Sequence, residues 1–242
     1  MKLKALIFTC ALLSFGITSA YAFEKTLLFH YGHSELHGGV AIANESANLD
    51  VYNGTQVTAY DNAVIRAYDN CTVEALGNTV VYANAKVKVR ASDNARITAK
   101  NSSDIDASGS AQVEASDTAT VTAHGNVKIT ASERSTIKAY DDCEVLASGD
   151  AKVEASGNAT VTARENVNVT ASGSATVKCY DNAVVNASDN VVVENYGDSK
   201  VIASAPSVKI IKHAKIDAVR DGELNKKPSF LERKDYLPTA QP

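Results

Sequence analysis

Three histidines near the N-terminus have a spacing that a metal ion can use. His30, His33 and His37 fall within the stretch HYGHSELH, and imidazoles this close in sequence converge if the backbone bends. The spacing matches no established zinc motif, and no cysteine lies nearby. The stretch therefore has two interpretations, a metal site built from the three imidazoles or a polar segment with exposed histidines.

A pair of carboxylates offers a second kind of chemistry. Asp104 and Asp106 stand two residues apart in NSSDIDAS, so on a β-strand both side chains leave the same face. Clustered carboxyls act as general acid and base in enzymes that cleave polysaccharides. The other interpretation is a ladder of ion pairs on a solvated sheet, which needs no reaction.

An eight-residue repeat must position these side chains. From Glu45 to Ser204 the chain divides into twenty octads without a gap. The fifth place is Val or Ile in nineteen octads, the seventh is Ala in seventeen, and the third is always Ala, Cys, Ser, Thr or Val. Apolar residues at alternate places indicate a strand that buries one face.

The remaining places of each octad form a corner. Asp-Asn and Gly-Asn pairs recur there, for example at 61–62, 77–78 and 93–94, and these residue types tolerate positive φ. A single octad cannot bury its narrow apolar face, but identical octads stacked about 4.8 Å apart can. The sequence therefore predicts an all-β fold, a parallel β-solenoid.

The residue types of the repeat also resemble those of a known family. GNATVTA at 157–163 and DNAVVNAS at 181–188 look like the octapeptide-repeat β-solenoid proteins found among bacterial exported and surface proteins. The resemblance covers about two-thirds of the chain. It implies the fold and an exported location, and it specifies no biochemical activity.

Charge stacking favours two octads per coil over three. Outward residues one coil apart should pair opposite charges. A spacing of sixteen residues gives only opposite pairs, which are Glu74 with Arg90, Arg90 with Asp106, Lys88 with Asp104, Lys128 with Glu144, Lys138 with Glu154, and Lys178 with Glu194. A spacing of 24 gives fewer opposite pairs and places Arg66 against Arg90 and Lys128 against Lys152. We therefore predict about ten coils of sixteen residues, with triangular 24-residue coils as the alternative.

The sixteen-residue coil stacks tyrosines at the corners. It places Tyr52 on Tyr68 and Tyr180 on Tyr196, as two exposed aromatic pairs. Such pairs either hold a sugar ring or simply stabilise the ladder. The cysteines Cys71, Cys143 and Cys179 take inward places, where we expect small apolar fillers rather than a free reactive thiol or an intermolecular disulfide.

Two further binding patterns are incomplete. Thr-Val-Thr at 120–122 and 160–162 resembles the threonine ranks of ice-binding solenoids, but charged residues adjoin Thr120 and Thr122 in the predicted stack. Aspartates share one corner row that glycines interrupt, which argues against calcium; they are Asp61, Asp93, Asp141 and Asp189. We expect no cofactor.

One duplication bears on the two faces. Residues 109–132 match residues 149–172 in sixteen of 24 places, at an offset of five octads. This offset is not a whole number of coils of either size. The duplicated block must therefore lie on a different face, so the faces are interchangeable.

The ends of the chain depart from the repeat. Residues 1–22 place Lys2 and Lys4 before an apolar run and end in Ala-Tyr-Ala, the order of a secretory signal cleaved after Ala22. We predict an N-terminal cap over 23–44, the solenoid over 45–219, and a C-terminal cap with a flexible tail over 220–242. The signal predicts a secreted, periplasmic or cell-surface protein.

Composition narrows the function. The net charge of −4 is spread over interspersed acids and bases, which argues against nucleic acid, and no later apolar segment is long enough to cross a membrane. We expect an exported, non-catalytic structural or adhesion-like rod with weak binding to a surface glycan or matrix component. A polysaccharide-active enzyme is the alternative, and an ice-binding protein is less favoured. The oligomeric state is left open.

Overall fold

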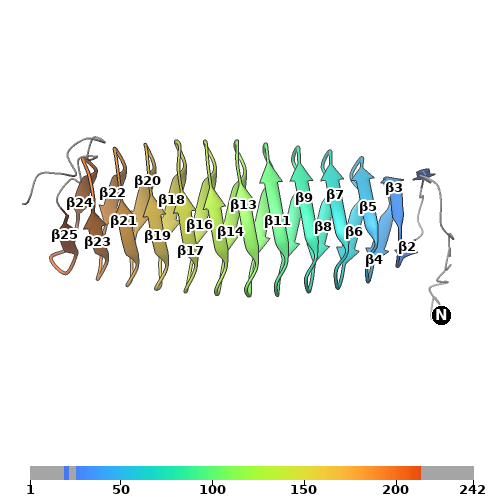
Figure 1. The fold of residues 1–242 in the computed structure, drawn as a ribbon, viewed down its shortest axis with the longest axis horizontal. Helices are drawn as coiled ribbons and strands as arrows, with labels where there is room; N and C mark the ends of the chain where they lie inside the picture. The colour runs from blue at the N-terminus through green and yellow to red at the C-terminus, as the bar shows by residue number, and fades with distance from the viewer. Residues whose placement is uncertain (1–18, 22–25, 214–242) are drawn as a thin grey trace, which may run out of the picture.

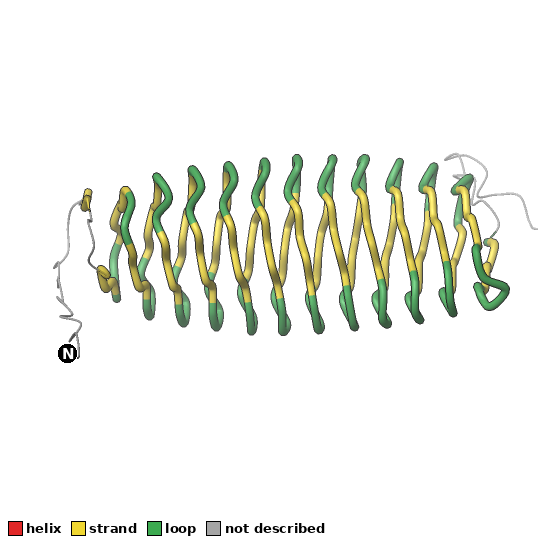
Figure 2. Tube along the Cα trace, turned by 180° about the vertical axis from the view of Figure 1, so that it is seen from behind, coloured by secondary structure: helices red, strands yellow, loops and turns green. Residues whose placement is uncertain are grey.

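Two parallel β-sheets face each other along a rod. The computed structural model describes residues 19–21 and 26–213, which form 25 strands. The odd-numbered strands make a 13-stranded sheet, sheet A, and the even-numbered strands make a 12-stranded sheet, sheet B. The chain alternates between the sheets at each corner, so the corners line both long edges of the rod (Figures 1 and 2). Within the described residues no helix is long and apolar enough to cross a membrane.

The strands are four or five residues long, apart from the first. Sheet A contains β1 (Ser19–Tyr21), β3 (His33–His37), β5 (Asn48–Tyr52), β7 (Val64–Tyr68), β9 (Val80–Asn84), β11 (Arg96–Lys100), β13 (Gln112–Ala115), β15 (Lys128–Ala131), β17 (Glu144–Ala147), β19 (Thr160–Ala163), β21 (Thr176–Cys179), β23 (Val192–Asn195) and β25 (Lys209–Lys212). Sheet B contains β2 (Thr26–Phe29), β4 (Val40–Ala43), β6 (Gln56–Ala59), β8 (Thr72–Ala75), β10 (Lys88–Ala91), β12 (Asp104–Ala107), β14 (Thr120–Ala123), β16 (Thr136–Ala139), β18 (Lys152–Ala155), β20 (Asn168–Ala171), β22 (Val184–Ala187) and β24 (Lys200–Ala203).

The strand register confirms the sixteen-residue coil. Lys88 pairs with Asp104, and Arg90 lies between Glu74 and Asp106. The pairs predicted further along the rod are also in register. The triangular alternative is wrong, because each strand pairs with the strand two elements away and not three.

The rod has more coils than the octads predict. Strands β2, β3 and β4 lie within the segment predicted as an N-terminal cap, yet they continue both sheets. Their coils have irregular lengths, since Thr26 pairs with Val40 and His33 pairs with Asn48. The sheets therefore contain about twelve coils rather than ten.

Parts of the predicted ends lie outside the described residues. This holds for residues 1–18 and 22 of the predicted signal, for its cleavage site, and for the C-terminal cap over 220–242. The short strand β1 falls within the predicted signal and pairs with β3.

The interior is a thin slab of small side chains. Third, fifth and seventh places point inward, and they are buried along the repeat as far as Val193. Fifth-place side chains stack in columns such as Val145, Val161 and Val177. Serine and threonine are tolerated at the third place because the hydroxyl donates to a carbonyl of the same corner, as from Ser103 to Lys100 at 2.8 Å. The three cysteines in the described part of the chain, Cys71, Cys143 and Cys179, are unpaired and buried, as their inward places predict.

The corners use positive φ, as their residue types predict. Asp61 has a φ of 59° and Gly77 a φ of 73°. The corner amides continue the hydrogen-bond ladder, since the Asn94 N–H donates to the carbonyl of Gly77 at 3.0 Å. Corners and strands together therefore link every coil to the coil before it.

The duplicated block lies on both faces. Its first copy begins with β13 in sheet A, whereas its second copy begins with β18 in sheet B. The prediction that the copies occupy different faces is confirmed. Nearly the same sequence thus serves either sheet.

Candidate functional site

The predicted tyrosine pairs are stacked. The ring centroids of Tyr52 and Tyr68 are 4.9 Å apart at 9°, and those of Tyr180 and Tyr196 are 4.8 Å apart at 9°. Both pairs lie on the edge of the rod where the strands of sheet A end. Their rings are half-buried rather than exposed, which differs from the expectation.

Other side chains cover the faces of these rings. His37 stacks on Tyr52 at 4.9 Å, and His213 stacks on Tyr196 at 4.1 Å. The guanidinium carbon of Arg164 lies 5.3 Å from the ring centroid of Tyr180. A sugar can therefore reach mainly ring edges and hydroxyls, so the tyrosines act first as ladder contacts.

Two of the phenols are electrostatically perturbed. The hydroxyl of Tyr196 donates to Glu194 at 2.6 Å, and this hydrogen bond to the neutral form raises the pKa of Tyr196 to about 12. Burial, followed by the nearby Asp50 carboxylate, raises the pKa of Tyr52. Both phenols remain neutral hydrogen-bond donors at physiological pH.

The three histidines face separate carboxylates. His30 lies 3.5 Å from Glu45, and His33 lies 3.7 Å from Asp50. His37 contacts Glu35 at 2.7 Å. On β3, His33 and His37 are four residues apart, or about 13 Å along an extended strand.

The histidines therefore do not surround one point. In the part of the chain that the structure describes, no cluster of three or more potential ligands could hold a metal ion.

The paired aspartates lie on an open face. Asp104 and Asp106 are exposed on β12, with Lys88 and Arg90 in register on β10. On their other side lie the threonines of β14, as predicted. This is the arrangement expected of a charge ladder. It also interrupts the threonine rank that ice binding would need.

The corner carboxylates have a role that sequence reasoning missed. The Asp93 carboxylate accepts from the Gly77 N–H at 3.2 Å, and the Asp141 carboxylate accepts from the Gly125 N–H at 3.1 Å. The Asp189 carboxylate likewise accepts from the Gly173 N–H at 2.9 Å. Each carboxylate accepts from the coil before its own, so this aspartate row forms hydrogen bonds to the backbone.

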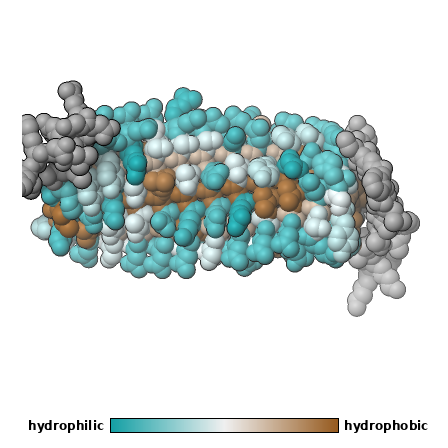
Figure 3. Space-filling view, viewed as in Figure 1, coloured by the Kyte–Doolittle hydropathy of each residue, from teal (hydrophilic) through white to brown (hydrophobic). Residues whose placement is uncertain are grey.

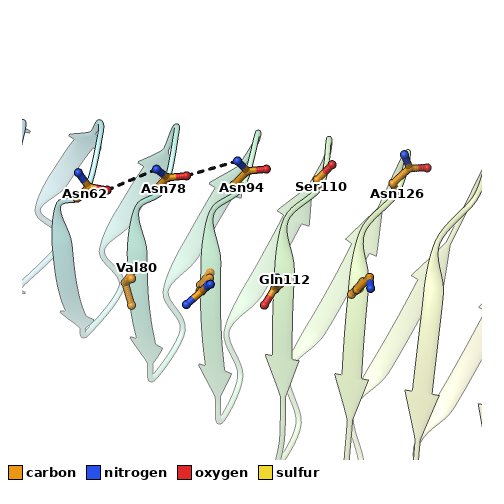
Figure 4. A pocket seen from close by; sticks show the side chains of 9 residues that line it. Asn62, Asn78, Val80, Asn94, Ser110, Gln112 and Asn126 are labelled. Carbon is orange, nitrogen blue, oxygen red and sulfur yellow. Dashed lines mark hydrogen bonds between the residues drawn. The ribbon is translucent and has the colours of Figure 1, made fainter.

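A groove on sheet A is the second feature missed. It has a volume of about 630 Å³ and runs between the corners and the strands. We call it the amide groove; its lining residues are Asn62, Asn78, Val80, Asn94, Arg96, Ser110, Gln112, Asn126 and Lys128. Figure 4 shows the corner side chains, Asn62, Asn78, Asn94, Ser110 and Asn126, in one row, with strand side chains such as Val80 and Gln112 in a second row beside it.

The signal for this groove was present in the octads. Second and fourth places both point outward around an inward third place, so they form two parallel ridges. Reading the second places at intervals of sixteen gives Asn62, Asn78, Asn94, Ser110 and Asn126. The predicted coil of sixteen residues therefore already implied this row.

No family model, curated protein or solved structure matches this chain. What the rod does is therefore inferred from its own residues.

Proposed function

We propose that this protein is an exported, non-catalytic β-solenoid that acts as a rigid structural or adhesion-like rod at a bacterial surface, with weak contact to a surface glycan or matrix component. The observation that carries the proposal is the continuity of the coils. Between β2 and β25 every connection has five residues or fewer. Catalytic and specific binding residues usually lie on longer loops, whereas short corners suit a spacer.

The dimensions and surface support the same role. Twelve steps of about 4.8 Å in sheet A give a rod about 58 Å long. The outward face seen in Figure 3 is largely hydrophilic, with apolar patches along its middle. Interspersed charges such as Lys138 and Glu154, 3.6 Å apart, keep such a surface compatible with solvent.

Cell fractionation and chemical sequencing test the exported location. We expect the protein in the periplasm or at the cell surface, with Phe23 as the first residue of the mature chain. An intact chain confined to the cytoplasm contradicts this part of the proposal.

Glycan binding and turnover separate the rod from its alternative. The purified chain should bind weakly on a glycan array and release no reducing ends from any polysaccharide. Replacing Tyr180 and Tyr196 by Ala tests the tyrosine edge directly. Polysaccharide turnover that an Asp104→Ala variant loses would instead establish the enzyme.

A further inference from the structure

We propose that the amide groove binds an extended acidic polysaccharide lying along the rod, with successive sugars against successive coils. The inference rests on the glycan contact of the proposed function, but it assigns that contact to residues distant from the tyrosine pairs. It also names the charge of the ligand.

The shape of the groove suits a polymer. Its corner row spans five coils, from Asn62 to Asn126. Four steps of about 4.8 Å give a length of about 19 Å. The groove is open and straight, and each coil contributes one corner side chain to it, an asparagine in every coil except that of Ser110 (Figure 4). A ligand with a matching linear repeat can make the same contact several times.

The corner amides suit sugar hydroxyls. Asn78 donates to Asn62 at 3.5 Å, and Asn94 donates to Asn78 at 3.4 Å. These long contacts orient the amides in a row and leave each with a further N–H and an acceptor lone pair. A hydroxyl is also both donor and acceptor, so a row of sugars can complete these hydrogen bonds.

The strand row supplies positive charge. Arg96 and Lys128 lie two coils apart with Gln112 between them, and the groove lining contains no carboxylate. Arg96 has Val80 and Gln112 as its register neighbours. Lys128 lies 3.7 Å from Glu144, which partly neutralises it. Arg96 is therefore the main anchor for an anionic sugar.

The nearest corner acids point elsewhere. Asp61 and Asp93 adjoin the asparagine row, but their carboxylates accept N–H groups of Glu45 at 3.3 Å and of Gly77 at 3.2 Å. They are engaged with the backbone of the preceding coil. Glu114 follows Gln112 by two residues on the outward face of β13, and it does not line the amide groove.

An aromatic ring adjoins the N-terminal part of the groove. Tyr82 is 45% exposed and leaves the same face of β9 as Val80. The Arg66 guanidinium carbon lies 5.8 Å from the ring centroid of Tyr82. Arg66 covers one face of this ring, as Arg164 does at Tyr180, but Tyr82 is more exposed than the stacked tyrosines, so its remaining open surface can contact the apolar face of a sugar.

Titration calorimetry with defined oligosaccharides tests the inference. The probe is oligogalacturonate added to the purified full chain, and its fully methyl-esterified form is the uncharged control. We expect saturable binding that strengthens with length up to about the span of the groove. The esterified form should bind about tenfold more weakly, the difference expected for one lost charge-assisted contact.

Matched variants locate the site. Arg96→Gln should weaken oligogalacturonate binding about tenfold, and Asn94→Ala should weaken both forms of the oligosaccharide. Lys88→Gln changes the same octad place on sheet B and should have no effect. Replacing Tyr180 and Tyr196 should also leave the affinity unchanged. All of these side chains point outward, and circular dichroism checks that each variant is folded.

Several results would overturn the inference. They are an absence of saturable binding, an equal loss in Lys88→Gln and Arg96→Gln, and tighter binding of a DNA oligonucleotide or polyglutamate of similar length. The last two would indicate attraction of any polyanion to the rod. None of them affects the exported location or the absence of turnover, so the proposed rod is tested separately.

Discussion

Placing a charge inside the slab is the most direct test of the fold. Val161 on β19 is fully buried, and Val161→Asp loses about 1.5–3 kcal/mol of apolar burial. An unpaired buried carboxyl has its pKa raised by up to about 3–5 units, so at pH 7 it stays largely protonated in the folded chain; relative to an unfolded pKa of about 3.9, this adds about 4 kcal/mol at 1.36 kcal/mol per unit. The total is comparable with the whole stability of a typical domain, about 5–15 kcal/mol.

The effect should depend on pH with a defined sign. In the folded variant the carboxyl pKa lies above its unfolded value of about 3.9, so the native state binds more protons than the unfolded state. Stability should therefore fall as the pH rises from 4 to 7. Urea denaturation followed by circular dichroism at both pH values measures the gap from the wild type, which should narrow at pH 4.

Two variants keep this test interpretable. Thr162→Asp places the same group one residue further on, outward and in register with Lys178, so it should change stability by less than about 0.5 kcal/mol. Val161→Ala is the substitute if the aspartate variant does not fold. It removes two carbons at about 0.8 kcal/mol each and leaves a cavity, so the free energy of unfolding should fall by about 2–3 kcal/mol. The inward and outward assignment would be refuted if Asp at 161 and at 162 lowered stability equally. It would also be refuted if the stability difference between Val161→Asp and the wild type did not change with pH.

Three further predictions concern the corners and the interior. Gly157→Ala should lose about 1–3 kcal/mol in thermal denaturation, because φ is +73° and a Cβ would lie 2.8 Å from the Asp141 nitrogen. The Tyr196 phenol should titrate spectrophotometrically at about 12, and Glu194→Gln should lower that value by removing the charged acceptor. A thiol reagent should label none of Cys71, Cys143 and Cys179 before unfolding, because burial keeps these thiols from solvent and raises their pKa values.

The interior and the coil length could be predicted because they depend on simple periods. Alternation of residues such as Val161 and Thr162 fixes which face is buried. Pairing of Lys88 with Asp104 selects sixteen residues over 24. These rules act locally and repeat twenty times, so single exceptions such as Asn195 do not obscure them. That asparagine is buried with its amide bonded to Ser199.

The N-terminal coils could not be predicted from the octads. Leu36 on β3 is fully buried where the repeat would place Ala, and its coil departs from sixteen residues. Once a coil can pair with a regular neighbour, its backbone hydrogen bonds tolerate such changes in side chain and length. The coils therefore extend beyond the octad repeat at the N-terminal end of the rod.

The candidate sites were harder to predict because they depend on which side chains the neighbouring coils place beside them. Sequence alone stacked Tyr52 on Tyr68, but it did not reveal that His37 covers the other face of Tyr52. The amide groove likewise combines second and fourth places from five coils. Residues such as Asn62 and Arg96 have no local pattern that marks them as neighbours.

The equivalence of the two sheets constrains how the chain can change in length. One octad is half a coil, so inserting a single octad keeps the sixteen-residue spacing between paired strands. It gives the strands beside the insertion new partners and turns all later residues by half a revolution about the rod. Asparagines after the insertion would then lie on the opposite flank, and the amide groove would be cut in two. Only insertions or losses of an even number of octads keep both flanks continuous, so lineages that retain a surface function should vary by whole coils.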